Sequence, residues 1–285
     1  MKATYIDHMG TDLSVVNAAK VSFGKRSEWE YEYDTDEGVS QAPAYKFSPS
    51  LLNKNRKVLS KKDQSLIAFL ARGCTSGDWE SVVNDVKYFG FEAGRGIDTG
   101  ELGDLLNHIR KMPSHWSPFA HTAITLHLKM PIFVARQIMK HTTGIEYNEV
   151  SRRYVDSEPE FYVPDVWRKK AEDVKQGSSD EAVDISYKFP WVDYGSSGGL
   201  EDYMEICIES YKSLLEAGVA PEQARMVLPQ SMYTEVIATG NLYAWANLYI
   251  QRTDSHAQKE TQDLANQIGE IIKPLYPVSW EALTK

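Results

Sequence analysis

The clearest hydrophobic periodicity in the chain begins at Leu200 and ends at Gly218. Apolar residues recur there every three or four positions, which predicts an amphipathic helix with one buried face. Pro221 is placed to begin a further short helix. The stripe consists of Met204, Cys207, Ile208, Tyr211, Leu214 and Leu215, and other helices are predicted at 12–20, 60–72, 131–141, 242–252 and 255–273.

Three shorter stretches are predicted to be strands, and residues 122–128 alternate between small or polar and apolar residues, which predicts one buried face there. They lie at residues 4–6, 122–128 and 233–239. Polar residues at the starts of the predicted helices favour capping. Asp12 is expected to cap the first helix, Ser60 with Asp63 the second, and Asp254 or Ser255 the last.

Other parts of the chain lack a clear period. Residues 24–57 are polar and aromatic, residues 73–104 are rich in Gly and Asp, and residues 172–199 are rich in Gly and Ser. A short helix is expected at 105–112, before Pro113. Because Gly, Ser and Asp favour loops, we interpret 73–104 and 172–199 as insertions into a single domain that spans the whole chain.

Composition narrows the class of protein. The 285 residues are 42% hydrophobic and carry a formal net charge of −9. This length provides a substantial core, in one large domain or two small ones. The acidic balance argues against non-specific binding to nucleic acid or to membranes. The two cysteines, Cys74 and Cys207, allow no disulfide framework and no Cys-rich metal site. With a polar N-terminus and no apolar run of the ~20 residues that span a bilayer, we expect a cytoplasmic protein.

In the middle of the chain, a hydrophobic segment is followed directly by a segment rich in charged and polar residues. Residues 130–135 are almost entirely hydrophobic, and residues 136–154 contain the four cations Arg136, Lys140, Arg152 and Arg153. Because guanidinium and ammonium groups bind phosphate, this stretch predicts an anion-binding site whose cations are held in place by the adjoining buried segment. A solvated helix end with surface salt bridges is the alternative interpretation.

Three further clusters carry candidate chemistry. His115 and His121 bracket a Ser-Pro turn, Arg225 precedes an apolar run and a proline, and Arg252 precedes Asp254, Ser255, His256, Gln258 and Glu260. A helix that begins near Ser255 would favour anions. The chain contains no HExxH pair, no Walker A loop and no G-x-G-x-x-G fingerprint. We therefore expect neither a resident metal nor a Rossmann-type dinucleotide site.

Taken together, these clusters resemble the flavin-dependent thymidylate synthases, a family that methylates dUMP without a cysteine nucleophile. The likeness covers residues 5–10, 16–22 and 60–72 and most of 113–164 and 200–284. Its most specific parts are Ser117-Pro-Phe with Pro131-Ile-Phe-Val-Ala-Arg-Gln137, Ala224-Arg-Met-Val-Leu-Pro229 and Arg252-Thr-Asp-Ser-His-Ala-Gln258.

The family signature runs Arg-His-Arg, two residues, Ser, one residue, Asn-Glu, one residue, Ser, one residue, Arg-Tyr. Its second half is retained here as Asn148, Glu149, Ser151, Arg153 and Tyr154. In the first half, Lys140-His141-Thr142 replaces Arg-His-Arg, and one extra residue precedes Asn148. Since the first half contacts the flavin in the family, we expect this protein to differ from its relatives there.

The resemblance implies an α+β fold with a central, mostly antiparallel sheet and flanking helices. It also implies a homotetramer with active sites shared between subunits. The implied reaction converts dUMP, methylenetetrahydrofolate and NADPH into dTMP, tetrahydrofolate and NADP, with FAD as the hydride carrier.

Roles for individual residues follow from the same resemblance. Arg252 is matched to the cation at the O2/N3 edge of the uracil, and His115 to a histidine near the reacting rings. Ser151 is expected to form hydrogen bonds rather than to act as a nucleophile, because no neighbouring base is evident. The matched dUMP-binding residues are Gln137, Lys140, Glu149, Ser151, Arg153, Arg225 and Arg252, and the matched flavin-contacting residues are Ser117, Lys140, His141, Thr142, Asn241 and Asn247.

Two other functions remain open from the sequence. The altered first half of the signature is compatible with a dUMP-binding homologue that has lost catalysis, which tight dUMP binding without FAD would indicate. His115, His121 and Asp254 could instead serve a metal-dependent phosphate-ester hydrolase, whose activity would survive removal of flavin.

Overall fold

A computed structural model describes residues 1–35, 38–43, 46, 56–72, 115–155, 157–171, 178–184 and 200–285. Two compact units can be distinguished in the chain. The first contains Met1–Asp7, Ile124–Gly240 and Asn247–Ile271, and the second contains His8–Ala123, Asn241–Ala246 and Ile272–Lys285. The insertion predicted at 73–104 and the helix predicted at 105–112 lie outside the described residues, and of 172–199 only 178–184 are described.

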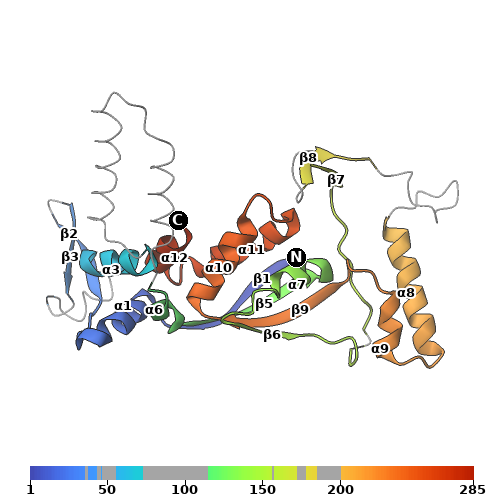
Figure 1. Cartoon of the computed structure of the whole chain (residues 1–285), viewed down its shortest axis with the longest axis horizontal. Helices are drawn as coiled ribbons and strands as arrows, with labels where there is room; N and C mark the ends of the chain where they lie inside the picture. The colour runs from blue at the N-terminus through green and yellow to red at the C-terminus, as the bar shows by residue number, and fades with distance from the viewer. Residues whose placement is uncertain are drawn as a thin grey trace, which may run out of the picture. The chain divides into compact units, whose positions relative to one another are not determined.

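A four-stranded sheet with the order β1-β5-β9-β6 forms the centre of the first unit (Figure 1). Strand β9 pairs antiparallel with β5, from Ile124 opposite Gly240 to Pro131 opposite Tyr233. On its other side β9 pairs antiparallel with β6, which ends with Glu149 opposite Val236. The strands are β1 (Lys2–Met9), β5 (Ala123–Pro131), β6 (Ile145–Glu149) and β9 (Tyr233–Gly240).

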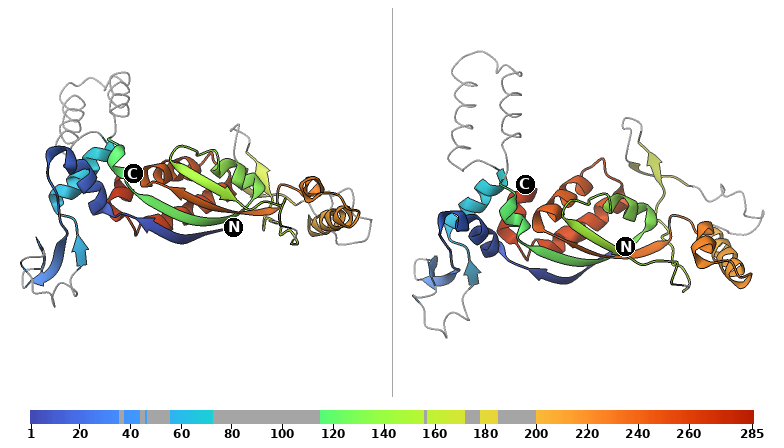
Figure 2. Two further views of the ribbon diagram at one scale, coloured as in Figure 1. Left: turned by 90° about the horizontal axis from the view of Figure 1, so that it is seen from below. Right: turned by 60° about the horizontal axis from the view of Figure 1, so that its bottom comes forward.

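One face of this sheet carries the core of the first unit. The buried residues of β5 are Ile124, Leu126, Leu128, Met130 and Pro131. Alternate residues of β9, from Thr234 to Gly240, are buried on the same face. Figures 1 and 2 show helices along this face. They are α7 (Ile132–Ile138), the end of α10 (Leu242–Thr253) and α11 (Lys259–Ile272). Each fully buried aliphatic side chain contributes about 1.5–3 kcal/mol to this packing.

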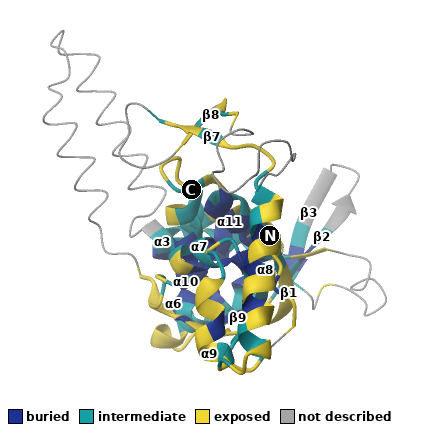
Figure 3. Ribbon diagram, turned by 90° about the vertical axis from the view of Figure 1, so that its right-hand side faces the viewer, coloured by how far each residue is buried: buried dark blue, intermediate teal, exposed yellow. Residues whose placement is uncertain are grey.

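The remaining elements of the first unit are short, apart from α8 (Leu200–Glu216). Met204, Cys207 and Tyr211 are the buried part of the stripe predicted for α8, and the opposite side of the helix is exposed (Figure 3). The others are β7 (Arg168–Lys170), β8 (Ser178–Ala182), α9 (Pro221–Ala224) and the 3-10 turn η3 (Arg225–Val227). Among the helices that the structure describes in either unit, none has the length and apolar content needed to cross a membrane.

The second unit combines helices with a small sheet of order β3-β2-β4, in which β2 pairs antiparallel with both neighbours. This sheet occupies the part of the chain where the sequence showed little periodicity. The elements are α1 (Asp12–Lys20), η1 (Val21–Phe23), β2 (Glu30–Thr35), β3 (Gly38–Pro43), β4 (Arg56–Val58), α3 (Lys61–Arg72), α6 (Ser117–Ala120) and α12 (Pro277–Thr284).

Two predicted helix caps are wrong. Thr11, not Asp12, is the N-cap of α1. The buried Asp12 carboxylate accepts hydrogen bonds from the backbone N–H groups of Val278 (2.9 Å) and Ser279 (2.8 Å), so it holds the start of α12. Burial raises the pKa of Asp12 above its ordinary value, although these hydrogen bonds oppose the shift. The last long helix was expected to begin at Ser255, but α11 begins at Lys259.

Within the second unit, an ion pair between Lys20 and the buried Asp63 joins α1 to α3. Ser60 begins α3 as predicted, since its hydroxyl oxygen accepts the backbone N–H of Asp63 at 3.1 Å. Burial alone would raise the pKa of Asp63, but hydrogen bonding with Lys20, Ser27 and Ser60 outweighs burial and lowers it. The charged carboxylate therefore stabilises the folded state above its ordinary pKa, and this contribution is lost as the pH falls through the lowered value.

Replacing Asp63 by Ala should reduce the free energy of unfolding by about 3 kcal/mol at pH 7, because Lys20 is left without its partner. The difference from the wild type should shrink when the pH falls below about 3.8, where the unfolded carboxyl is protonated. Denaturant unfolding at several pH values measures both effects. Asp263→Ala is the control, since the Lys259–Asp263 pair is exposed and should contribute less than about 1 kcal/mol. Equal losses in the two variants would contradict the argument.

Candidate active site

Arg252, at the C-terminal end of α10, is held by two acceptors from a different part of the chain. Its Nε donates to Nε2 of His141 at 2.9 Å, and its terminal NH2 group donates to the backbone oxygen of Gln137 at 2.9 Å. Because an arginine has no proton to lose near neutral pH, Nε2 of His141 must accept, which requires a neutral imidazole. Burial, and then the charge of Arg252, lower the pKa of His141 in agreement with this.

A tyrosine closes the turn that carries His141. The hydroxyl of Tyr147 donates to the backbone oxygens of His141 (3.0 Å) and Ile138 (3.2 Å). Tyr147 pairs with Ala238 on the buried face of the sheet, and burial raises the pKa of its hydroxyl, so the donor proton is retained. Lys140 and Thr142 are exposed on the same turn. Tyr147 therefore holds the start of the variant half of the signature, through the backbone at Ile138 and His141.

A cavity of about 540 Å³ lies beside Arg252 in the first unit. Gln137 and Gln258 line it and are joined to each other by a 2.6 Å hydrogen bond from Nε2 to Oε1. Arg168, from β7, also lines it and forms an ion pair with the buried Glu260 at 2.6 Å. Burial opposes the charge of Glu260, but the hydrogen bond with Arg168 outweighs it and lowers the pKa of this carboxyl. Sequence reasoning did not single out Arg168, because it belongs to a run of three cations, Arg168–Lys170, of the kind that is usually solvated.

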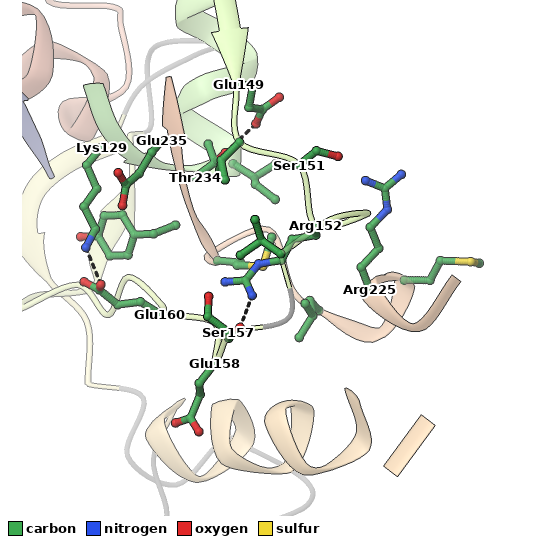
Figure 4. Close-up of a pocket in the computed structure, with 17 residues that line it drawn as sticks. Lys129, Glu149, Ser151, Arg152, Ser157, Glu158, Glu160, Arg225, Thr234 and Glu235 are labelled. Carbon is green, nitrogen blue, oxygen red and sulfur yellow. Dashed lines mark hydrogen bonds and ion pairs between the residues drawn. The ribbon is translucent and has the colours of Figure 1, made fainter. Parts of the chain in front are cut away.

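A larger cavity of about 870 Å³ in the same unit is lined by two residues of the second half of the signature, Glu149 and Ser151 (Figure 4). It brings Glu149 and Ser151 together with Arg225, although Arg225 comes from the distant η3 turn. The hydroxyl of Thr234 donates to Oε1 of Glu149 at 2.7 Å, which fixes the carboxylate at the end of β6.

Arg153, expected at the dUMP site, is not among the residues that line this cavity. It is exposed, and its guanidinium lies over the ring of Tyr154, 5.1 Å from the ring centre. The adjacent Arg152 lines the cavity instead. One feature of the sequence could have indicated this, namely that the residue between Ser151 and Arg153 is itself a cation.

His115 and Ser117 line a separate cavity of about 720 Å³ within the second unit. The rings of His115 and Phe69 lie 5.2 Å apart in a tilted arrangement. Asn241 also belongs to this unit, and its side-chain oxygen accepts the backbone N–H of Ala244 at 2.9 Å, at the start of α10. Asn247 lies on α10 in the first unit and is half-buried.

The residues of the alternative hydrolase site have other partners or are solvent-exposed. His121 is exposed, and Asp254 accepts a hydrogen bond from the backbone N–H of His256 at 2.8 Å. Within the described ranges, no group of three His, Cys, Asp or Glu residues is arranged to hold a metal ion.

Comparison with known proteins decides the family. The model of the family described as thymidylate synthase complementing protein matches residues 50–278. The chain belongs to this family. The flavin-dependent thymidylate synthase of Thermosipho africanus is 40% identical over 192 residues, which are 67% of this chain and 81% of that protein. The flavin-dependent thymidylate synthase of Thermus thermophilus is 38% identical over 173 residues, 59% of this chain and 58% of that protein.

A solved structure adds a likeness over nearly the whole chain. The crystal structure of a UMP/dUMP methylase, PolB from Streptomyces cacaoi, bound with 5-Br dUMP, has a TM-score of 0.59 and 25% identity. The alignment covers 99% of this chain and 94% of that one. These comparisons confirm the resemblance found in the sequence, place this family member in the class of flavin-dependent thymidylate synthases, and confirm the mixed fold of helices and antiparallel sheet.

Replacing Arg252 by Gln should raise the pKa of His141, because the neighbouring charge that disfavours the imidazolium is removed. A pH titration of the histidine ring signals by NMR measures this pKa in both proteins. Arg56→Gln is the matched control, since Arg56 is an exposed arginine on β4 and its loss should leave the pKa of His141 unchanged. An unchanged pKa for His141 in Arg252→Gln would show that Arg252 does not set its protonation.

Proposed function

We propose that this protein methylates C5 of the uracil ring of dUMP, using methylenetetrahydrofolate as carbon donor and NADPH as reductant. The balanced reaction is dUMP, methylenetetrahydrofolate, NADPH and a proton to dTMP, tetrahydrofolate and NADP. The observation that carries the proposal is Arg252, a permanent cation fixed by His141 and by the Gln137 backbone at a cavity wall. Reaction at C5 requires negative charge to develop on the uracil, and a preorganised cation at its O2/N3 edge stabilises that charge.

The hydrogen bonds of Arg252 make it suitable for this role. Both acceptors are uncharged, so its positive charge is not neutralised by the groups that orient it. Gln137 and Gln258 stand beside it, and amides of this kind can bind the polar edge of a pyrimidine. We assign uracil binding to this cavity wall.

The cavity of the second unit suits part of a flavin, and FAD, when bound, would supply the hydride. Leu66, Phe69 and Pro118 provide apolar walls for a ring, and Lys25 and Lys62 provide cations for a diphosphate. Ser117 contributes a hydroxyl to the same lining. In the first unit, the turn held by Tyr147 presents Lys140 and Thr142 to solvent. Lys140 keeps one of the two cations that Arg-His-Arg provides in the family.

Ser151 is assigned to substrate binding rather than to covalent catalysis. Its Oγ accepts the backbone N–H of Arg153 at 3.3 Å. Glu149, the nearest carboxylate in the sequence, already accepts a hydrogen bond from Thr234. A serine needs an adjacent base to become a nucleophile. The assembly into a homotetramer with shared sites remains part of the proposal, supported by the family resemblance alone.

UMP is a second candidate substrate. The PolB structure, described as a UMP/dUMP methylase, aligns with 99% of this chain. The thymidylate synthase of Thermosipho africanus aligns with 67%. Likeness along the full length to a protein described as acting on both nucleotides favours testing the ribonucleotide beside dUMP.

The purified protein should be yellow and should form dTMP from dUMP only when FAD, NADPH and methylenetetrahydrofolate are all present. An absorption spectrum and product analysis with each component omitted measure this. UMP is assayed in parallel, and its methylation would support the second candidate. A protein that binds dUMP but never takes up FAD would indicate a homologue without catalysis. Phosphate release that depends on a metal and survives removal of flavin would indicate the hydrolase.

Arg252→Ala should abolish turnover, whereas Ser151→Ala should keep measurable activity. Loss of one preorganised electrostatic contact to the transition state costs about 10²–10³ in kcat. Initial rates and dUMP dissociation constants for both variants separate binding from chemistry. If Ser151→Ala is as inactive as Arg252→Ala while it binds dUMP normally, the non-covalent role of Ser151 is wrong.

A further inference from the structure

A histidine stands beside Arg252 at the cavity to which uracil binding is assigned. His256 and Arg252 both line this cavity of about 540 Å³. Arg252 lies at the end of α10, and His256 lies in the turn that leads to α11. Within this turn, the backbone N–H of Ala257 donates to the oxygen of Asp254 at 2.9 Å. The closed turn fixes the position of the histidine relative to the arginine.

Asp254 orients the imidazole ring of His256. Its Oδ1 accepts the backbone N–H of His256 at 2.8 Å and lies 2.9 Å from Nδ1 of the ring. The hydroxyl of Ser255 is farther from Nδ1, at 3.5 Å. The backbone hydrogen bond, and then the one from the ring, lower the pKa of Asp254, so its carboxylate is charged near neutral pH and can only accept. Nδ1 of the neutral ring therefore carries the proton, and Nε2 keeps an unprotonated lone pair.

Among the described residues that line this cavity, His256 is the one whose side chain can accept a proton near neutral pH. Arg168 and Arg252 line it as permanent cations. The remaining side chains of the lining are amides, a hydroxyl and a methyl group, which are not bases at this pH. They belong to Gln137, Gln258, Ser178 and Ala257.

Methylation at C5 of a uracil ring requires such an acceptor. When the incoming carbon has bonded to C5, this atom still holds its original hydrogen. Breaking the C5–H bond returns its electron pair to the ring, and the proton passes to a base. The nearby charge of Arg252 stabilises the electrons that are left on the ring. A positioned base contributes about 10²–10⁴-fold to the rate of a proton transfer of this kind.

We propose that His256 is the base that removes the C5 proton through Nε2, and that Asp254 is the positioning residue that holds its ring. The inference rests on the proposed function, since it concerns one step of the same reaction. The side chains of His256 and Asp254 are 68% and 56% exposed. The imidazolium can therefore release its proton to water before the next turnover, and no further group is needed to carry it away.

The groups around His256 determine how the pH dependence of this step is interpreted. The charged ones are Arg252 from α10, Arg168 from β7 with its partner Glu260 from α11, and Asp254 from the turn itself. His141, which accepts a hydrogen bond from Arg252, has its pKa lowered by burial and then by that arginine. Protonation of His141 should therefore reduce the rate only below the ordinary histidine range, and should do so in every variant that retains it.

The test is the pH dependence of dTMP formation in a single turnover of the FAD-loaded protein, which separates the chemical steps from product release. The wild-type rate should fall at acidic pH as the imidazole of His256 is protonated. His256→Gln should lower the rate about 10²–10⁴-fold and abolish this acidic limb, while dUMP still binds. Asp254→Asn should also lower the rate without loss of dUMP binding, because an amide can donate to Nδ1 and so favour the wrong tautomer. Imidazole added to His256→Ala should restore part of the rate.

His121→Gln is the matched control, because His121 is exposed and does not line this cavity. It should keep both the rate and the acidic limb of the wild type. An unchanged rate in His256→Gln, or a lowered rate that keeps the wild-type acidic limb, would overturn the role of His256. A wild-type protein that forms no dTMP would instead overturn the proposed function itself, so the two failures are distinguishable.

Discussion

The antiparallel register of β9 with β5 and β6 determines where the polar residues around the cavities of the first unit lie. With Glu149 opposite Val236 and the N–H of Val150 bonded to the oxygen of Glu235, β6 ends directly beside Thr234. Thr234 then holds the Glu149 carboxylate, and the turn that follows delivers Ser151 and Arg152 to the cavity. A shift of one residue would exchange the two faces of the strand and remove this arrangement.

The same register explains how the variant signature is accommodated. Tyr147 lies opposite Ala238, a small residue on the buried face, and its hydroxyl reaches back to the oxygens at 138 and 141. The turn it fastens presents His141 to Arg252, which follows 111 positions later in the sequence. A neutral histidine can accept this hydrogen bond, whereas a protonated one would repel the arginine. The altered residues of the signature therefore lie on a turn whose histidine keeps a defined role.

Elements with a long hydrophobic period could be predicted from the sequence. The strands β5 and β9 and the helices α1, α3, α8 and α10 lie where the pattern placed them, because one buried face dictates their spacing. Strand β6 could not be predicted, because it is half of a polar signature and only Ile145 in it is buried. The partners of Asp12 lie 266 and 267 positions away, so nothing near it in the sequence marks its role. Which of Arg152 and Arg153 lines the large cavity depends on the turn after β6, and the residue pattern does not specify this turn.

Flavin-dependent methylation at C5 of a uracil nucleotide is the reaction that we propose for this protein. The most direct measurement is the release of tritium to water from dUMP labelled at C5, because the new methyl group must replace that hydrogen. We expect one tritium to be released for each dTMP formed, and we expect this release to be lost in Arg252→Ala. Formation of dTMP with the label retained, or release that does not require flavin, would contradict the proposed reaction.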